Sequence, residues 1–259
     1  MIISACRASH GRRVLRRVWP FRRNFSSEMP VLHEDEHILA ILKPSGLSVH
    51  GGASVRKEES VIGRLTGVSS RPSLFLVHRL DAPTTGALVL AKSKHVATLL
   101  ERAFSEGLVT KKYIAAVVPE QDHGPWRRQG TIDADVGGKP ATTHFTTLAG
   151  RQGPCRLLEL IPTTGRTHQL RIHCATSLGA PILGDTKYGR TRLGPQRDVL
   201  DQLGLEKRNS PPLFLHCETL RVPYIKETAR EISLVPALFT SISAPLPDHF
   251  RTLATFTNS

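Results

Sequence analysis

A carboxylate in a turn rich in Pro and Gly is the side chain best placed for chemistry. Residues 78–86 have the sequence His-Arg-Leu-Asp-Ala-Pro-Thr-Thr-Gly and lie between the apolar runs 74–77 and 87–91. A strand that ends at such a turn and is followed by a second strand holds its Asp on a rigid scaffold facing a cleft. Asp81 is therefore the candidate centre of the chemistry. The local residues leave one alternative open, an Asp that only accepts hydrogen bonds from turn amides.

Two further segments combine side chains that bind or react. Residues 111–113, Lys-Lys-Tyr, begin an apolar strand, where Tyr113 can present its ring face and hydroxyl to a cleft. Residues 163–173 have the sequence Thr-Thr-Gly-Arg-Thr-His-Gln-Leu-Arg-Ile-His. On a helix, His168 and Arg171 share a face, and the guanidinium could pair with a carboxylate from another strand. Taken singly, the tyrosine is also a good strand residue, and the basic residues could form a solvated helix face.

Hydrophobic periodicity predicts the elements that must position these side chains. A helix is predicted at 94–106, because apolar residues recur at i, i+3, i+4 and i+8 from Val96 and Gly107 stands where a helix would end. Two more helices are predicted at 60–65 and at 166–177. Strands are predicted at 38–42, 74–79, 87–91, 112–118, 141–148, 156–161, 213–221 and 232–235.

The connections between these strands indicate the fold class. Many are too short for a parallel crossover, so we expect a sheet that is largely antiparallel or mixed, in an α+β domain. The segment 189–212 is polar and contains prolines, which predicts a surface insertion.

The first 27 residues differ from the rest of the chain. They contain seven Arg and neither Lys, Asp nor Glu, which is typical of a mitochondrial leader. We expect residues 1–25 to be a transit peptide, a mature start near Ser26, and one catalytic domain at 26–259. A basic arm that binds nucleic acid and a nuclear signal are the alternatives. The leader supplies seven charges of the net +13, and the remaining surplus suits a polyanionic partner.

Cysteine and histidine usage gives little support to a metal or disulfide framework. Cys155, Cys174 and Cys217 are isolated, which fits buried thiols in a reducing compartment. His168 and His173 are five residues apart, so they do not share a helix face as ligands four apart would. We therefore predict no metal. No apolar run approaches the ~20 residues that cross a bilayer, so no membrane span is expected.

Taken together, these segments resemble the RluA-type family of RNA pseudouridine synthases. The family shares His-Arg-Leu-Asp-x-x-Thr-Ser-Gly, a Lys-x-Tyr strand, and Gly-Arg-x-His-Gln-Leu/Ile-Arg-x-His followed by Leu-Gly-x-Pro-Ile-x-Gly-Asp. The matching segments here are 78–86, 111–113, 165–173 and 178–185, with Lys-Pro-Ser-Gly-Leu-Ser-Val-His at 43–50 and Leu-His-Cys-Glu-Thr-Leu at 215–220. The resemblance covers about residues 31–225 in the family's order. Thr85 stands where Ser is usual, and Ala87 where a larger apolar residue is common.

The resemblance implies a fold and a reaction. The implied fold is a mixed, mostly antiparallel bent sheet with flanking helices and a central active-site cleft. The implied reaction converts a uridine in RNA to its carbon-linked isomer. Asp81 would be the nucleophile or charge partner, attacking the sugar or assisting loss of the base, and Arg171 would pair with it. Tyr113 would lie against the uracil and help remove the proton from carbon 5, and Arg79 would enter the space left by the flipped uridine.

The same motifs imply further contacts and partners. Substrate-binding roles would fall to His78, Leu80, Lys43, Arg166 and His168. No cofactor is required, because the substrate and product are isomers. The separate N-terminal RNA-binding domain of many relatives is not expected. We expect a monomer in the mitochondrial matrix that acts on rRNA, tRNA or mRNA. The alternative is an RNA-binding or assembly factor on the same fold whose catalysis is dispensable.

Overall fold

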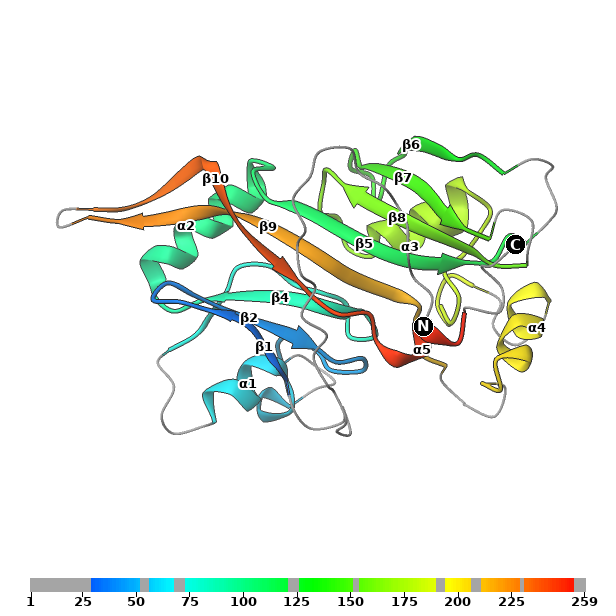
Figure 1. The fold of residues 1–259 in the computed structure, drawn as a ribbon, viewed down its shortest axis with the longest axis horizontal. Coiled ribbons are helices and arrows are strands. Elements are labelled where there is room, and N and C mark those ends of the chain that lie inside the picture. Colours follow the sequence, from blue (N-terminus) through cyan, green and yellow to red (C-terminus); the bar gives the residue numbers. More distant parts are fainter. Residues whose placement is uncertain are drawn as a thin grey trace, which may run out of the picture.

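A mixed ten-stranded sheet forms the framework of the molecule in the computed structural model (Figure 1). The structure describes residues 29–51, 56–67, 73–120, 126–150, 154–189, 194–205, 211–228 and 231–253. The expected transit peptide at 1–25 lies outside these ranges. Within them, no helix is both long and apolar enough to cross a membrane.

The strands run through both halves of the molecule in the order β1-β2-β4-β9-β5-β8-β7-β6, with β3 paired to β4 and β10 to β9. Only β4 and β9 pair in parallel, so the expected mixed, mostly antiparallel sheet is confirmed. Their bounds are β1 Val31–Glu34, β2 Ile38–Lys43, β3 Phe75–Leu76, β4 Thr85–Ala91, β5 Thr110–Val117, β6 Gln129–Asp133, β7 Thr142–Ala149, β8 Arg156–Pro162, β9 Leu215–Glu227 and β10 Ile232–Ser243.

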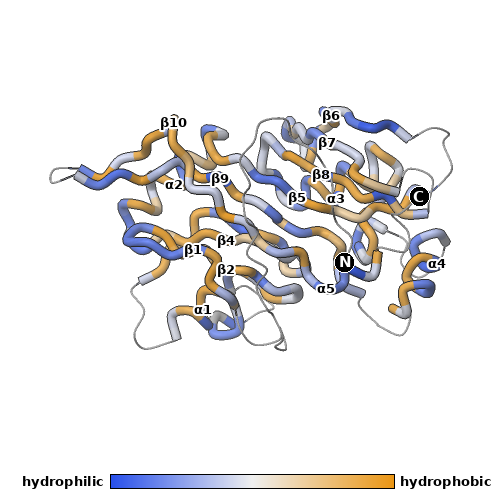
Figure 2. The backbone as a smooth tube through the Cα atoms, in the orientation of Figure 1, coloured by the Kyte–Doolittle hydropathy of each residue, from blue (hydrophilic) through white to orange (hydrophobic). Residues whose placement is uncertain are grey.

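The central strands are apolar because they are covered on both faces. Every residue of β2 and β4 is buried, and both strands are mostly hydrophobic in Figure 2. Gly86 in β4 lies against β9 so closely that an added Cβ would sit 2.3 Å from the carbonyl oxygen of Cys217. The glycine therefore permits the parallel contact between β4 and β9, which joins the two halves of the sheet.

The helices are α1 (Val61–Thr66), α2 (Lys94–Ser105), α3 (Gln169–Ile172), α4 (Pro195–Gln202) and α5 (Asp248–Arg251). The prediction for α2 is confirmed: Ser93 Oγ caps the helix by accepting from the Val96 amide, and Gly107 follows its end with a φ of 73°.

One expectation about local structure is wrong. The helix predicted to start at about Arg166 begins at Gln169, and it continues as a π-helical turn at His173–Ser177. The segment expected to be a surface insertion contains α4, which buries Val199 and Leu200. Two strands, β1 and β6, were not predicted. Each is a peripheral strand of four or five residues with partly exposed side chains, so its hydrophobic pattern is weak.

Candidate active site

A cleft with a volume of about 570 Å³ brings the predicted segments together. It is lined by the turn after β3, by α2 and β5, and by the segment that connects β8 to α3. The predicted site residues in its lining are His78, Arg79, Leu80, Asp81, Tyr113, Arg166, His168 and Arg171. The tertiary structure thus gathers in one place motifs that are up to about 90 residues apart, as the hydrogen bond between Arg171 and Asp81 shows directly.

Asp81 stands at the first position of a tight turn that leads from β3 to β4. The Thr84 amide donates to the Asp81 carbonyl oxygen at 3.0 Å, which closes the turn over Ala82 and Pro83. The Asp81 side chain is 24% exposed and lines the cleft, so its carboxylate is accessible there. This geometry favours the chemical interpretation of Asp81 over the structural one.

Lys43 lies beneath this turn, which corrects the expectation that it contacts substrate. Its side chain is fully buried and its Nζ donates to three carbonyl oxygens, those of Pro44 at 2.8 Å, Ala82 at 2.9 Å and Thr84 at 2.9 Å. An ammonium with all three protons bound to backbone cannot also bind a ligand in the cleft. Lys43 therefore holds the turn that carries Asp81.

Arg171 approaches Asp81 as predicted, but its closest partner is a different carboxylate. Its Nη1 lies 3.4 Å from Oδ2 of Asp81. Its Nε and Nη2 donate to the two carboxylate oxygens of Asp185 at 2.7 and 2.8 Å. Asp185 was not among the predicted site residues. The signal was present, because it closes the segment 178–185 that carries the family resemblance.

Burial and pairing act in opposite directions on this ion pair. Burial acts to lower the pKa of Arg171, but its hydrogen bonds to Asp185 and the charge of that carboxylate raise the pKa above the usual arginine value. Burial acts to raise the pKa of Asp185, but Arg171 and the backbone amides of Lys187 and Tyr188 lower it. Both groups are therefore ionised, and Arg171 lies between two carboxylates.

His168 reaches Asp81 from outside the helix. Its φ is 60°, the only positive φ of a non-glycine residue among the described positions, and it precedes the first residue of α3. Its Nδ1 hydrogen-bonds the Tyr188 hydroxyl at 2.9 Å, and its Nε2 lies 3.8 Å from Oδ1 of Asp81. Burial and the nearby Arg171 lower the pKa of His168, although Asp81 acts to raise it. The left-handed backbone, which sequence periodicity could not reveal, turns this ring toward the carboxylate.

Tyr113 forms part of the cleft wall on β5 and is only 9% exposed. Burial, together with the neighbouring Cys217 and Asp81, raises its pKa well above the usual value for a tyrosine. The hydroxyl thus keeps its proton at neutral pH. In the free protein Tyr113 offers a ring face and a neutral hydroxyl, and it does not offer a ready base.

His78 and Leu80 shape the wall between the turn and α2. The backbone amide of Val89 donates to Nε2 of His78 at 2.9 Å, and the ring stacks on Phe104 of α2 with centroids 4.7 Å apart. Burial, with Lys111 nearby, lowers the pKa of His78 to about 3. The imidazole is therefore neutral and acts as an acceptor. Leu80 is buried and contributes apolar surface.

Basic side chains lie around the opening and the wall of the cleft. Nη2 of the exposed Arg79 donates to the Thr167 hydroxyl at 2.7 Å, which links the Asp81 turn to the β8–α3 segment. Nε of Arg166 donates to the Pro140 carbonyl oxygen at 3.2 Å. Lys111 was named in the sequence motif but not predicted as a site residue. It lines the cleft, and its Nζ donates to the Thr164 carbonyl oxygen at 3.2 Å.

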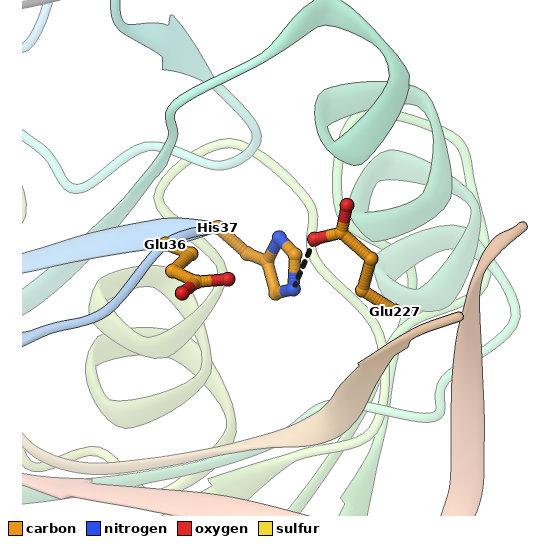
Figure 3. Close-up of side chains that lie close together, drawn as sticks. All are labelled: Glu36, His37 and Glu227. Carbon is orange, nitrogen blue, oxygen red and sulfur yellow. Dashed lines mark ion pairs between the residues drawn. The ribbon is translucent and has the colours of Figure 1, made fainter. Parts of the chain in front are cut away.

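One group of potential metal ligands occurs elsewhere among the described residues (Figure 3). Glu36 and His37 lie between β1 and β2, and Glu227 ends β9. The donor atoms of all three lie within 4.8 Å of one another, and His37 Nε2 is 3.7 Å from Glu227 Oε2. None of the three lines the cleft, so a metal there would take no part in chemistry at Asp81. The three free cysteines, Cys155, Cys174 and Cys217, are buried as expected.

The cleft places an accessible carboxylate, a guanidinium and a tyrosine side by side, which is the arrangement of an enzyme active site, and comparison with known families specifies which kind. The family model described as RNA pseudouridylate synthase matches residues 37–176, which is more than half of the chain. This chain belongs to the RNA pseudouridylate synthase family, and its activity is that of an RNA pseudouridine synthase.

Individual relatives give the same result. The ribosomal large subunit pseudouridine synthase C of Rickettsia bellii is 40% identical over 234 residues, which cover 85% of this chain and 69% of that protein. The mitochondrial pseudouridylate synthase RPUSD4 of Homo sapiens is 33% identical over 248 residues, covering 79% and 65% of the two chains. The solved structure of human RNA Pseudouridylate Synthase Domain Containing 4 matches with a TM-score of 0.65 and 32% identity, covering 86% of this chain and 91% of that one.

Proposed function

We propose that this enzyme isomerises a uridine of mitochondrial RNA to pseudouridine, with Asp81 as the nucleophile. The observation that carries the proposal is the placement of an accessible carboxylate 3.4 Å from a buried guanidinium, in a cleft that also contains Tyr113. An Asp attacks through its carboxylate, and the guanidinium of Arg171 lies within 3.4 Å of that carboxylate and orients it.

The reaction can be written so that atoms and electrons balance. An oxygen of Asp81 donates an electron pair to carbon 1′ of the ribose, while the bond from carbon 1′ to N1 breaks and its pair leaves with the uracil. The uracil turns, carbon 5 forms the new bond to carbon 1′, and Asp81 leaves with its electron pair. The proton on carbon 5 is then removed and N1 is protonated, so the product is an isomer of the substrate.

The remaining cleft residues take roles that suit their positions. The ring of Tyr113 lies against the uracil. Its neutral hydroxyl takes part in the late removal of the carbon 5 proton only by passing its own proton onward. Arg79, exposed at the opening, enters the space that the flipped uridine leaves in the RNA. His78 and Phe104, whose rings stack on each other, form part of the cleft wall.

The leader and the relatives support a location and a first target. The acid-free, Arg-rich first 27 residues and the mitochondrial name of the human relative support import into the matrix. Relatives named for the ribosomal large subunit make large ribosomal RNA the first target to examine. The basic surplus supplies phosphate contacts, so RNA affinity should fall steeply with added salt.

An Asp81→Ala variant in cells that lack the native chain tests the proposal. Pseudouridines are mapped across mitochondrial rRNA, tRNA and mRNA with the wild-type chain, with the variant and with neither. We expect Asp81→Ala to leave the target uridine unmodified and to retain RNA binding in vitro. If the modification and the cellular phenotype both survive, the chain acts as a binding or assembly factor and Asp81 is not the nucleophile.

A further inference from the structure

Asp185, the second partner of Arg171, is buried behind the cleft. Its side chain is 0% exposed and that of Arg171 is 7% exposed. Oδ1 of Asp185 also accepts from the backbone amides of Lys187 and Tyr188 at 2.9 and 3.0 Å. The carboxylate is thus held by backbone as well as by the guanidinium, and its position does not depend on substrate.

The two carboxylates divide the donors of Arg171 between them. Asp185 takes Nε and Nη2 in a bidentate pair, which leaves Nη1 to point at Asp81. Because the bidentate contact fixes the plane of the guanidinium, it also fixes the direction of this remaining donor. Rotation of Arg171 away from Asp81 would break both bonds to Asp185.

The charges at the cleft change during the proposed reaction. When Asp81 bonds to carbon 1′, its carboxylate becomes a neutral ester and no longer offsets the charge of Arg171. A buried guanidinium without an anion is strongly destabilised. If Asp81 were the only partner of Arg171, the loss of its negative charge would therefore raise the energy of the intermediate. Asp185 remains ionised and paired throughout.

We infer that Asp185 is a positioning residue, the permanent counterion that keeps Arg171 charged and aimed when Asp81 gives up its own charge to the substrate. This inference rests on the proposed role of Asp81. Asp185 itself does not line the cleft, so it acts through Arg171 and not on the uridine.

A thermal double-mutant cycle tests the counterion role without substrate. Asp81→Asn mimics the neutral ester and should leave the melting temperature near that of the wild type, because Asp185 still pairs with Arg171. Asp185→Asn should lower the melting temperature more than Asp81→Asn does. The double variant leaves the buried guanidinium without an anion, so its melting temperature should fall at least about 5 °C below the sum of the single effects. Additive effects would overturn the inference while leaving the role of Asp81 intact.

Single-turnover kinetics provide a second test of the counterion role of Asp185. Asp185→Asn should lower the single-turnover rate about 100-fold and change the RNA dissociation constant less than about threefold, because the RNA surface is untouched. Asp185→Glu keeps the anion, and its single-turnover rate should be at least about tenfold higher than that of Asp185→Asn. The control is Asp201→Asn, which removes a carboxylate from the exposed ion pair with Arg197 on α4 and should change neither quantity. Equal rates for the Asn and Glu variants would contradict the inference.

If Asp185→Asn does not fold, the cycle is run on Asp185→Glu. Adding Asp81→Asn to that variant should lower the melting temperature no more than it does in the wild type, since an anion still pairs with Arg171. A larger fall would overturn the inference. The Asp81→Ala variant distinguishes this result from a failure of the proposed function. If Asp81→Ala retains activity, Asp81 is not the nucleophile, and the result of the thermal cycle is unaffected.

Discussion

The ammonium nitrogen of Lys43 lies 2.9 Å from the carbonyl oxygen of Ala82, the residue that follows Asp81. This contact joins the end of β2 to the turn that presents the carboxylate, across 39 positions of sequence. Two more carbonyl oxygens, of Pro44 and Thr84, complete the environment of the same nitrogen. The turn that carries Asp81 is therefore built around a buried amino group, and its rigidity depends on the hydrogen bonds of that group.

Replacing this ammonium should reduce both stability and rate. Lys43→Met keeps most of the side-chain volume but leaves three carbonyl oxygens without a donor, which should cost about 1–3 kcal/mol of unfolding free energy. The single-turnover rate should fall at least tenfold, because Asp81 loses its fixed position. Lys94→Met, at an exposed position on α2, is the matched control and should change neither. A Lys43→Met variant with the wild-type rate would show that the turn keeps its conformation without the lysine.

The buried ammonium also predicts a dependence of stability on pH. Burial lowers the pKa of Lys43 to about 7, although Asp81 acts to raise it, whereas the unfolded chain keeps the ordinary lysine value. Between these two values the unfolded state binds more protons, so folding gains stability as pH rises. The difference in unfolding free energy between wild type and Lys43→Met should increase from pH 7 to pH 9 by up to about 1.4 kcal/mol per pH unit. Denaturant titrations measure this, and a constant difference would contradict it.

Removing Arg171 should damage the fold as well as the chemistry. Arg171→Leu leaves Asp185 buried and unpaired, which should cost about 3–5 kcal/mol. The double variant Arg171→Leu/Asp185→Leu removes both charges and should recover most of that stability, but it should show no turnover while retaining RNA affinity. Melting temperatures and single-turnover assays on the same preparations separate the two effects. If the double variant regained the wild-type rate together with its stability, Arg171 would have no role in the reaction.

Arg79 should affect RNA opening without affecting stability. Its side chain is exposed and donates a hydrogen bond to the Thr167 hydroxyl, so Arg79→Ala should change the melting temperature by less than about 2 °C. Turnover on structured RNA should fall at least tenfold, whereas a short single-stranded substrate that needs no base flipping should lose less. Arg221→Ala, an exposed arginine on β9 that packs over Phe239, is the control. Equal losses on both substrates would argue against the role in flipping.

The hydroxyl of Tyr113 should matter late in the reaction. Tyr113→Phe keeps the ring against the uracil, so RNA affinity should be retained while release of pseudouridine slows by about 10²–10⁴-fold. Because burial holds the pKa of Tyr113 well above its usual range, the wild-type rate should show no ionisation of this hydroxyl between pH 6 and 9. Tyr224→Phe, at a position on β9 that is 47% exposed, provides the control. Normal release by Tyr113→Phe would assign the proton transfer to another group.

Most strands and the main helix could be predicted from local pattern. The apolar runs of β2 and β4 and the capped stripe of α2 are signals carried by neighbouring residues, and they survive in the structure. Prediction failed where tertiary contacts override local preference. The left-handed backbone at His168 delays the start of the predicted helix to Gln169, because the ring is held by Tyr188 and faces Asp81.

The sequence alone determined the family, the reaction and the candidate nucleophile, because ordered motifs record chemistry that their spacing preserves. It could not assign partners to charges, since a pairing such as that of Arg171 with Asp185 depends on where separate segments meet in space. Only the tertiary structure moved Lys43 from the substrate to the floor of the Asp81 turn and brought Asp185 into the site. The physical reason is burial: a charge removed from water must find its partners within the fold, and those partners come from wherever the chain packs.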